Sequence, residues 1–358
     1  MWPYWLLFSF FAVGALLQGS PQVAARPGAE AHVADRSPVA TPMLILGGLL
    51  IAAMVGLRYK VGADWKTYYF YWQYAGYADL ERILGMSDPA YQLLNWLAQQ
   101  AGAGIWLVNL ACGALFAWGL IRLAGTQPLP WLAVVAALPY LVTVVAMGYS
   151  RQAVAIGILM AGLASVFRGA SLLRFAVYVL VAALFHKTAV LLMPLVIFAS
   201  ERNRLMSVLG GLLLFYAFYT ALLANDVDQL VKSYIVTQYN SQGAAIRVGL
   251  CLVPAVLFLL SPARFGFDRL QERYWRLNSL TAVGLLVALF VVPSSTAIDR
   301  MALYVFPLQL AVLSRVPIAY PGRGSQLLVV LYALVVELVW MTQAVHARFW
   351  IPYQVYPF

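Results

Sequence analysis

Charged side chains are scarce in this sequence. Of its 358 residues only 10% are Asp, Glu, Lys or Arg, whereas 63% are hydrophobic. A soluble domain contains about 25% charged residues, so this composition excludes an ordinary soluble globular protein. The expected class is an all-α, polytopic membrane protein, with residues 1–358 forming a single integral-membrane domain.

Cysteine and histidine are rarer still. Cys112 and Cys251 lie inside apolar runs, and His32, His186 and His346 are far apart in the chain. There is no CxxC motif, so neither a disulfide framework nor a structural zinc site is expected. A metal-dependent glycosyltransferase normally has a DxD motif in an early outer loop, but the only one here is late, at 226–228. We expect no metal and no other cofactor.

Two further features of the chain limit its class. The first 17 residues, MWPYWLLFSFFAVGALL, lack the positively charged segment of a signal peptide, which favours a first membrane span. The net charge is +10, but the basic residues are scattered between apolar runs. This distribution does not suit a nucleic-acid-binding surface, and no nucleic acid partner is expected.

The apolar runs predict about 11–12 membrane spans. The spans lie near 3–18, 42–58, 104–122, 130–148, 151–167, 205–223, 246–261, 278–293, 297–314 and 325–345. Residues 174–199 form either one long helix or a broken, re-entrant pair that meets at the FHKT sequence, residues 185–188.

The positive-inside rule favours the broken pair. The basic connections 168–174, 200–204, 262–277 and 315–324 can all be cytoplasmic only if the chain enters at 174 and returns by 199. Both chain ends then lie outside. Residues 87–100 and 228–239 have apolar residues on a helical period and predict amphipathic helices on the outer surface.

This topology brings costly polar residues to one face of the membrane. They are Arg58, Asp64, the YSRQ sequence at 149–152, His186 and the AIDRM sequence at 297–301. A charged residue at mid-helix costs about 2.5–3.5 kcal/mol on insertion scales, so such residues pair or line a wet cavity. Anchoring of helix ends is the simpler explanation for one terminal Arg, but not for several that converge.

The residue types suggest a chemistry for this face. Because an Arg side chain binds phosphate oxygens at two points, Arg58, Arg151 and Arg300 are candidates to hold a diphosphate. Asp64 and His186 are candidate general bases. A salt bridge from Asp64 to Arg58 or Lys60, or a hydrogen-bonded core histidine, would explain the two residues without catalysis. Lys187 beside His186 favours a polar cavity and is a further candidate for substrate binding.

Five motifs resemble those of the EpsG family of exopolysaccharide polymerases. They occur in the family's order as LRYKVGADWKTYYFYW, YSRQAVAIGILM, ALFHKTAVLLMPL, DRMALYVFPL and WIPYQVYPF. The match to R-x-x-x-G-x-D-x-x-x-Y departs from the family at Ala63, where many members have Thr. The motifs add four candidate substrate-binding residues: Tyr68, Gln152, Asp299 and Tyr304.

The resemblance implies a Wzy-like polymerase with a GT-C-like fold in the bacterial inner membrane. Such an enzyme joins oligosaccharide repeat units carried on undecaprenyl diphosphate at the periplasmic face, without a metal. A flippase and a chain-length regulator of the same pathway are possible partners, beside the lipid bilayer. The alternatives are a polysaccharide flippase or transporter, an O-antigen ligase and a membrane acyltransferase.

Overall fold

The computed structural model describes residues 1–19, 40–199, 209–213, 215–216, 220, 241, 243–292, 294–322 and 324–356. Within these residues the regular elements are helices, as expected, and the only β feature is an isolated bridge between Arg58 and Val355. The predicted span 205–223 lies largely outside the described residues. The predicted amphipathic helix 228–239, the DxD motif and the 200–204 connection lie wholly outside them.

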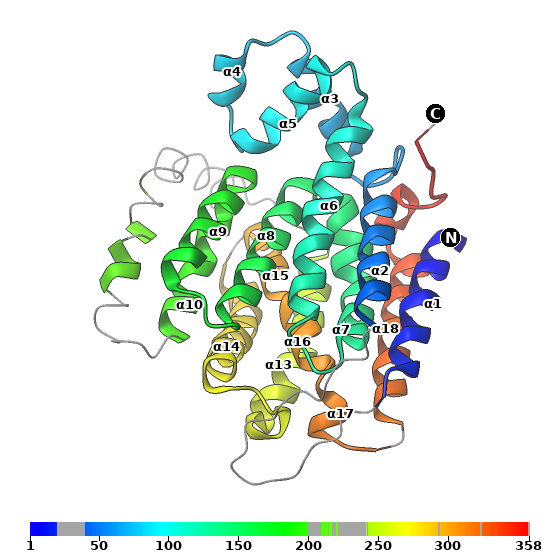
Figure 1. Ribbon diagram of the computed structural model, residues 1–358, viewed down its shortest axis with the longest axis vertical. Helices are drawn as coiled ribbons and strands as arrows, with labels where there is room; N and C mark the ends of the chain where they lie inside the picture. The colour runs from blue at the N-terminus through cyan, green and yellow to red at the C-terminus, as the bar shows by residue number, and fades with distance from the viewer. Residues whose placement is uncertain are drawn as a thin grey trace.

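The helices run up and down between two ends of the molecule (Figure 1). In the N-terminal half they are α1 (Trp2–Leu17), α2 (Ala40–Gly56), α3 (Trp65–Ala75), α4 (Leu80–Leu84), α5 (Pro89–Gln100), α6 (Ile105–Ala124), α7 (Pro130–Ala137), the π-helix η1 (Leu138–Ala146) and α8 (Ser150–Val166). In the C-terminal half they are α9 (Leu172–Phe185), η2 (Lys187–Leu192), α10 (Met193–Ala199), α13 (Ala244–Leu260), η5 (Pro262–Phe265), α14 (Arg269–Val291), α15 (Ser295–Val305), α16 (Pro307–Leu313), α17 (Val316–Ala319), α18 (Ser325–Gln343) and η6 (Val345–Phe349).

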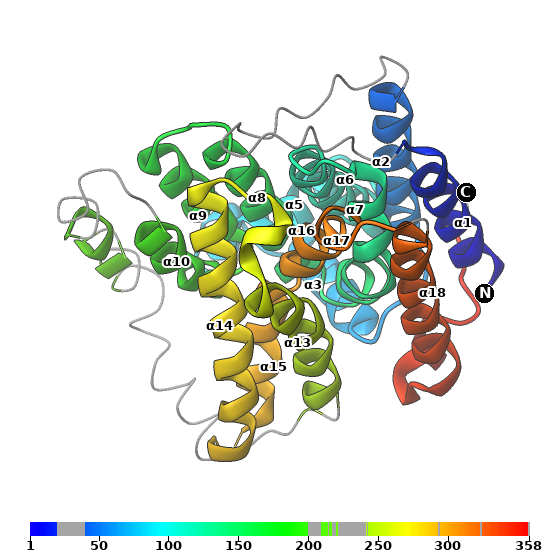
Figure 2. The same cartoon turned by 90° about the horizontal axis from the view of Figure 1, so that it is seen from below.

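The bundle has a buried centre and two flanks (Figure 2). Helices α6, α7, α8 and α16 lie in the middle, with α1, α2 and α18 on one side and α9 and α10 on the other. Side chains of α7, η1 and α8 are almost all buried. In contrast, α1, α2 and α18 expose large apolar side chains, as expected of helices that face lipid.

Small residues let the central helices approach closely. A Cβ atom added to Gly119 of α6 would lie 1.7 Å from the carbonyl oxygen of Gly157 in α8. No side chain fits at that distance, so the α6–α8 contact requires glycine at 119. Close backbone contact of this kind is typical of helix packing in membranes.

Among the described residues, three helices are long and apolar enough to cross a membrane: Ile105–Ala124, Arg269–Val291 and Ser325–Gln343. Residues 295–319 make a fourth only if a pair of helices bent by 41° counts as one span. The remaining apolar helices have 10–17 residues. The chain is thus a multi-pass membrane protein, whereas the expected number of spans and the GT-C-like fold stay predictions.

The predicted break in 174–199 is present. Helix α9 ends at Phe185, His186 adopts an extended backbone conformation, and η2 and α10 then pack against α9. The span predicted near 297–314 corresponds to a bent pair of helices, because the axis bends between α15 and α16. Pro307 explains the bend: it has no N–H for the α-helical bond to the preceding turn.

The two ends of the bundle differ in character. At one end lie α3–α5, the start of α8, the end of α9 and the start of α15, where the predicted polar residues are found; we call it the site end. The opposite end carries the connections of Arg168, Arg264 and Arg315. The segregation matches the pattern from which the topology was predicted, although which side faces the cytoplasm stays a prediction.

Cysteine labelling tests this topology. In a protein with Cys112 and Cys251 replaced, we expect a cysteine at exposed Tyr77 to react with a membrane-impermeant maleimide applied outside the cell. A cysteine at exposed Ala263 should react only after the membrane is opened, since it lies at the opposite end. Labelling of both positions from the same side would contradict the arrangement.

Candidate active site

Asp88 is the most connected acidic residue at the site end. It precedes α5, where an Asp normally caps the helix, yet its side chain makes no capping bond. Its backbone is left-handed, with φ at 59°, and only 5% of the residue is exposed. One carboxylate oxygen lies 2.7 Å from Arg151 Nη1, and the other accepts a 3.3 Å hydrogen bond from the Lys187 N–H. Asp88 therefore joins α8 to the break after α9.

His186 lies beside the same carboxylate. Its Nδ1 is 3.6 Å from Asp88 Oδ2, just beyond hydrogen-bond length, and both ring nitrogens lack a hydrogen-bond partner within the described part of the chain. Catalytic hydrogen bonds are often long until substrate binds. A small rotation of the ring would complete an Asp–His pair.

Two opposing effects set the ionisation of Asp88. Burial favours the neutral carboxyl, but His186, the positive charge of Arg151 and the Lys187 amide outweigh it. Together they hold the pKa of Asp88 below its usual value. Asp88 is thus negatively charged near neutral pH, where it fixes its neighbours and is poorly suited to accept a proton.

Arg151 lies at the first turn of α8, where it remains partly accessible. Its side chain is 23% exposed, and its guanidinium carbon lies 5.4 Å from the centre of the Tyr71 ring. Tyr68, buried against Tyr91, lies next to the same guanidinium. With one nitrogen held by Asp88, Arg151 has the remaining nitrogens of its planar fork to offer to an anion.

A tight turn brings Asp64 towards this cluster. Gly62 has φ at 106°, and a Cβ atom there would lie 2.4 Å from the carbonyl oxygen of Met147. Only glycine therefore suits this position, which explains the glycine two residues before Asp64 in the first motif. Neither Arg58 nor Lys60 forms an ion pair with Asp64 in the described part of the chain.

Asp64 differs from Asp88 in its electrostatics. Burial raises the pKa of Asp64 above its usual value, while the charges of Arg300 and Arg151 oppose that rise only in part. A raised pKa makes a carboxylate a better proton acceptor near neutral pH. A salt bridge to Arg58 would lower the pKa of Asp64, but the Arg58 guanidinium is engaged elsewhere.

Arg58 is a core residue in this structure. Only 1% of it is exposed, and its guanidinium donates to the Val55 carbonyl, to Asn109 Oδ1 at 3.3 Å and to Ser150 Oγ at 2.7 Å. These contacts favour a structural role at the start of α8, next to Arg151. The contact of Arg58 with a diphosphate stays a prediction.

Arg300 is the second arginine of the cluster. It lies on α15, and Gln152 Nε2 donates a 2.8 Å hydrogen bond to its backbone carbonyl. Among the described residues, no hydrogen bond or ion pair engages its guanidinium, and its charge acts on Asp64 and His186. Tyr304, one turn further along α15, is hydrogen-bonded to Thr188 at 2.9 Å.

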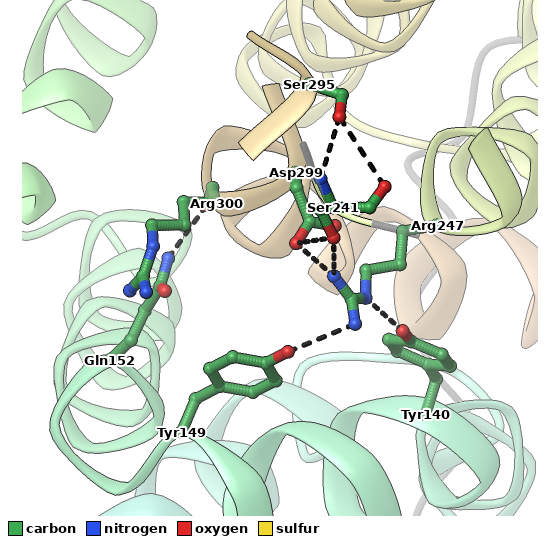
Figure 3. Close-up of polar contacts among 8 residues, drawn as sticks. All are labelled: Tyr140, Tyr149, Gln152, Ser241, Arg247, Ser295, Asp299 and Arg300. Carbon is green, nitrogen blue, oxygen red and sulfur yellow. Dashed lines mark hydrogen bonds and ion pairs between the residues drawn. The ribbon is translucent and has the colours of Figure 1, made fainter. Parts of the chain in front are cut away.

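Asp299 faces a different neighbour. It pairs with Arg247 of α13, and Ser241 Oγ donates a 3.0 Å hydrogen bond to it (Figure 3). Arg247 also reaches the hydroxyl groups of Tyr140 and Tyr149. Asp299 is therefore held in a buried ion pair, and its contact with substrate stays a prediction.

The structure thus brings Asp64, Arg151, His186 and Arg300 together, with Gln152, Lys187, Tyr68 and Tyr304 around them. It adds two residues that sequence reasoning missed. Asp88 directly precedes Pro89, a sequence typical of a helix cap, and Arg247 lies inside the predicted span 246–261. An arginine within an apolar span was the available signal for the second. Among the described residues, no group of three or more His, Cys, Asp or Glu could hold a metal ion.

A family model now accounts for these motifs. The model of the EpsG family matches residues 43–355, nearly the whole chain. The chain belongs to the EpsG family. A search of curated proteins and a search of solved structures each found no match.

Hydrogen bonds to distant segments hold the closing WIPY motif of this EpsG protein. Trp350 Nε1 donates a 2.8 Å hydrogen bond to the Thr143 carbonyl, and Tyr353 donates one of 2.7 Å to the Met54 carbonyl. The Gly62 N–H donates a 2.9 Å bond to the Phe349 carbonyl. The last motif therefore packs against the first, and it supports the turn that places Asp64.

Replacing Asp88 tests its linking role. We expect Asp88→Asn to lower the free energy of unfolding by about 3 kcal/mol, because it leaves a largely buried Arg151 without a carboxylate. Glu272→Gln is the matched control: it breaks the exposed pair with Arg276 and should cost about 0.3–0.5 kcal/mol. The measurement is thermal or denaturant unfolding of the detergent-purified protein.

The unfolding free energy lost in Asp88→Asn should also depend on pH. A carboxylate with a lowered folded-state pKa stabilises the fold above its unfolded pKa of about 3.9, and this contribution disappears as pH falls through the folded-state pKa. The difference between wild type and Asp88→Asn should therefore shrink below about pH 4. A constant difference, or none at pH 7, would contradict the assignment.

Proposed function

We propose that this EpsG-family protein is a Wzy-like glycosyltransferase that polymerises lipid-linked oligosaccharide repeat units. The donor is a glycan on a polyprenyl diphosphate, with undecaprenyl diphosphate as the expected carrier. The acceptor is a sugar hydroxyl of the next lipid-linked unit. The reaction takes place at the periplasmic face of the bacterial inner membrane.

One observation carries this proposal beyond family membership. Two arginines with accessible or unengaged guanidinium groups, Arg151 and Arg300, act on the same carboxylate, Asp64. They come from α8 and α15, far apart in sequence, and meet at one end of a membrane bundle. A cationic pair beside a proton acceptor is what displacement of a diphosphate requires.

The reaction can be written with these groups. The bond between the anomeric carbon and the diphosphate oxygen breaks, and the acceptor oxygen forms the new bond to that carbon. Arg151 and Arg300 offset the negative charge that develops on the leaving diphosphate. Asp64 accepts the proton of the acceptor hydroxyl, since its raised pKa suits that task better than the lowered pKa of Asp88.

The Asp88–His186 pair is the alternative base. His186 has two nitrogens without partners in the described residues, and Asp88 is placed to orient the ring. We favour Asp64, because burial raises its pKa and no ion pair engages its carboxylate within the described chain.

The proposed orientation of the site in the membrane rests on the positions of positively charged residues. Arg168, Arg264, Arg273 and Arg276 lie at the end opposite the site. Positive residues in short connections favour the cytoplasm, which leaves the site end outside. A lipid-linked substrate could then reach Arg151 and Arg300 from the outer leaflet.

Replacing Arg151 tests diphosphate recognition. We expect Arg151→Lys to lower polymerisation by about 10²–10³, because lysine keeps the charge but loses the planar fork of donors. The measurement is polymer formed by cells or by reconstituted protein, with membrane accumulation of the variant as control. Polymer of wild-type amount and length would mean that Arg151 only anchors its helix.

Two substitutions identify the base. In an assay with purified protein and lipid-linked repeat units, Asp64→Asn should lower kcat by at least about 10², with donor binding retained. His186→Gln should have the smaller effect. The reverse order would assign the base to His186, and normal polymerisation by both variants would contradict a catalytic role for this cluster.

A further inference from the structure

Arg247 lies at the centre of a polar network beside the proposed active site (Figure 3). Its guanidinium donates to the Tyr140 hydroxyl, the Tyr149 hydroxyl at 3.0 Å, Ser241 Oγ at 3.3 Å and the Asp299 carboxylate. The contacts come from η1, the start of α8, the residues before α13 and α15. One side chain thus ties four segments together.

The network is too enclosed to receive a substrate as it stands. The side chains of Arg247 and Asp299 are 11% and 6% exposed, and they neutralise each other. Replacing a buried ion pair by apolar residues is often neutral for stability, so stability alone does not explain the pair. The position of the ion pair next to Arg300 does explain why the pair is present.

Helix α15 needs external support to hold a fixed orientation. It has only 11 residues and bends away from α16 by 41°. Phe306, at the bend, stacks on Tyr140 with ring centres 4.6 Å apart and planes 11° apart. Tyr140 is in turn a partner of Arg247, so the same guanidinium braces both the bend and the helix before it.

Two ties then set the rotation of α15. On one side Asp299 is held by Arg247, and on the other the Arg300 carbonyl accepts the hydrogen bond from Gln152. Adjacent residues of a helix point about 100° apart, which follows from 3.6 residues per turn. Holding Asp299 against α13 therefore directs Arg300 to the face of Gln152, the neighbour of Arg151, as Figure 3 shows.

We propose that Arg247 and Asp299 are a positioning pair, which fixes α15 so that the Arg300 guanidinium faces the leaving diphosphate. The inference rests on the proposed function and assigns the pair no contact with substrate. It predicts that the pair acts on the reaction only through Arg300. A misplacement of about 1 Å in a binding group can cost about 10²-fold in rate.

A double-mutant cycle tests this dependence in the purified, reconstituted protein. Asp299→Asn and Arg300→Gln should each lower kcat/KM for the lipid-linked unit by about tenfold or more. The double variant should be no worse than Arg300→Gln alone, because there is then no guanidinium left to position. Multiplication of the two effects would overturn the proposal.

A second pair of substitutions separates positioning from folding. Arg247→Met combined with Asp299→Leu leaves no buried charge unpaired, so we expect near-normal accumulation and thermal midpoint. Activity should still fall about tenfold or more, since apolar contacts do not fix the rotation of α15. Full activity of this folded double variant would overturn the proposal, as would unfolding with no loss in kcat/KM of the surviving protein.

Two single variants complete the experiment, Arg247→Lys and the control Arg276→Gln. Lysine keeps the ion pair but cannot reach Asp299 and both tyrosines together, so Arg247→Lys should lose less activity than the combined Arg247→Met and Asp299→Leu variant. Arg276→Gln, which breaks an exposed pair with Glu272, is the control and should match wild type. An inactive wild type would refute the proposed function, whereas an active wild type with additive losses would refute only the positioning pair.

Discussion

The buried carboxylate of Asp88 is the constraint on which the site end depends. A negative charge in a largely apolar bundle has to be compensated, and here the compensation comes from Arg151, His186 and the Lys187 N–H. These groups belong to α8 and to the break between α9 and η2, so meeting the demands of one carboxylate sets their relative positions. The left-handed backbone at Asp88 costs free energy, but Asp tolerates it better than most residues.

The arginines of this protein fall into two physical classes. Arg58 at the site end and Arg315 at the opposite end are almost fully buried, and neutral oxygens surround them. Arg315 donates to Gln127, Gln271 and the carbonyls of Phe265 and Gly266, which closes the connection before α14. Their donors are used by the fold itself. Arg151 and Arg300 retain donors that the fold does not use, and this difference makes them the candidates for chemistry.

The sequence predicted which segments meet, but not which way their side chains point. Hydrophobic runs and basic connections predicted a helical membrane protein, the break at FHKT and the convergence of Asp64, Arg151, His186 and Arg300 on one end. The same reasoning grouped Arg58 with Arg151. In a helix, neighbouring positions differ by about 100° in direction, so proximity in a motif does not fix orientation. Arg58 turns inward to Ser150, and Asp299 turns away from its neighbour Arg300.

Other differences arise from contacts between distant segments. Asp88 has the sequence signature of a helix cap, yet Arg151 and the Lys187 amide, 63 and 99 positions away, compete for its side chain. Arg247 appears as one polar residue in an apolar span, and its five-group network exists only once η1, α8 and α15 have packed together. Local propensity cannot contain such information, because these bonds join elements that are far apart in the sequence.

The position of the site at the ends of helices follows from the same physics. Helices α5, α8, α13 and α15 all begin at this end, and each first turn has N–H groups without helical partners. Such N–H groups can offset the charge of carboxylates that lie near them, as the Lys187 N–H does at the start of η2 for Asp88. Short helices, a break and a bend therefore have one common effect. They bring several helix ends to a single point, where polar side chains from distant segments can meet.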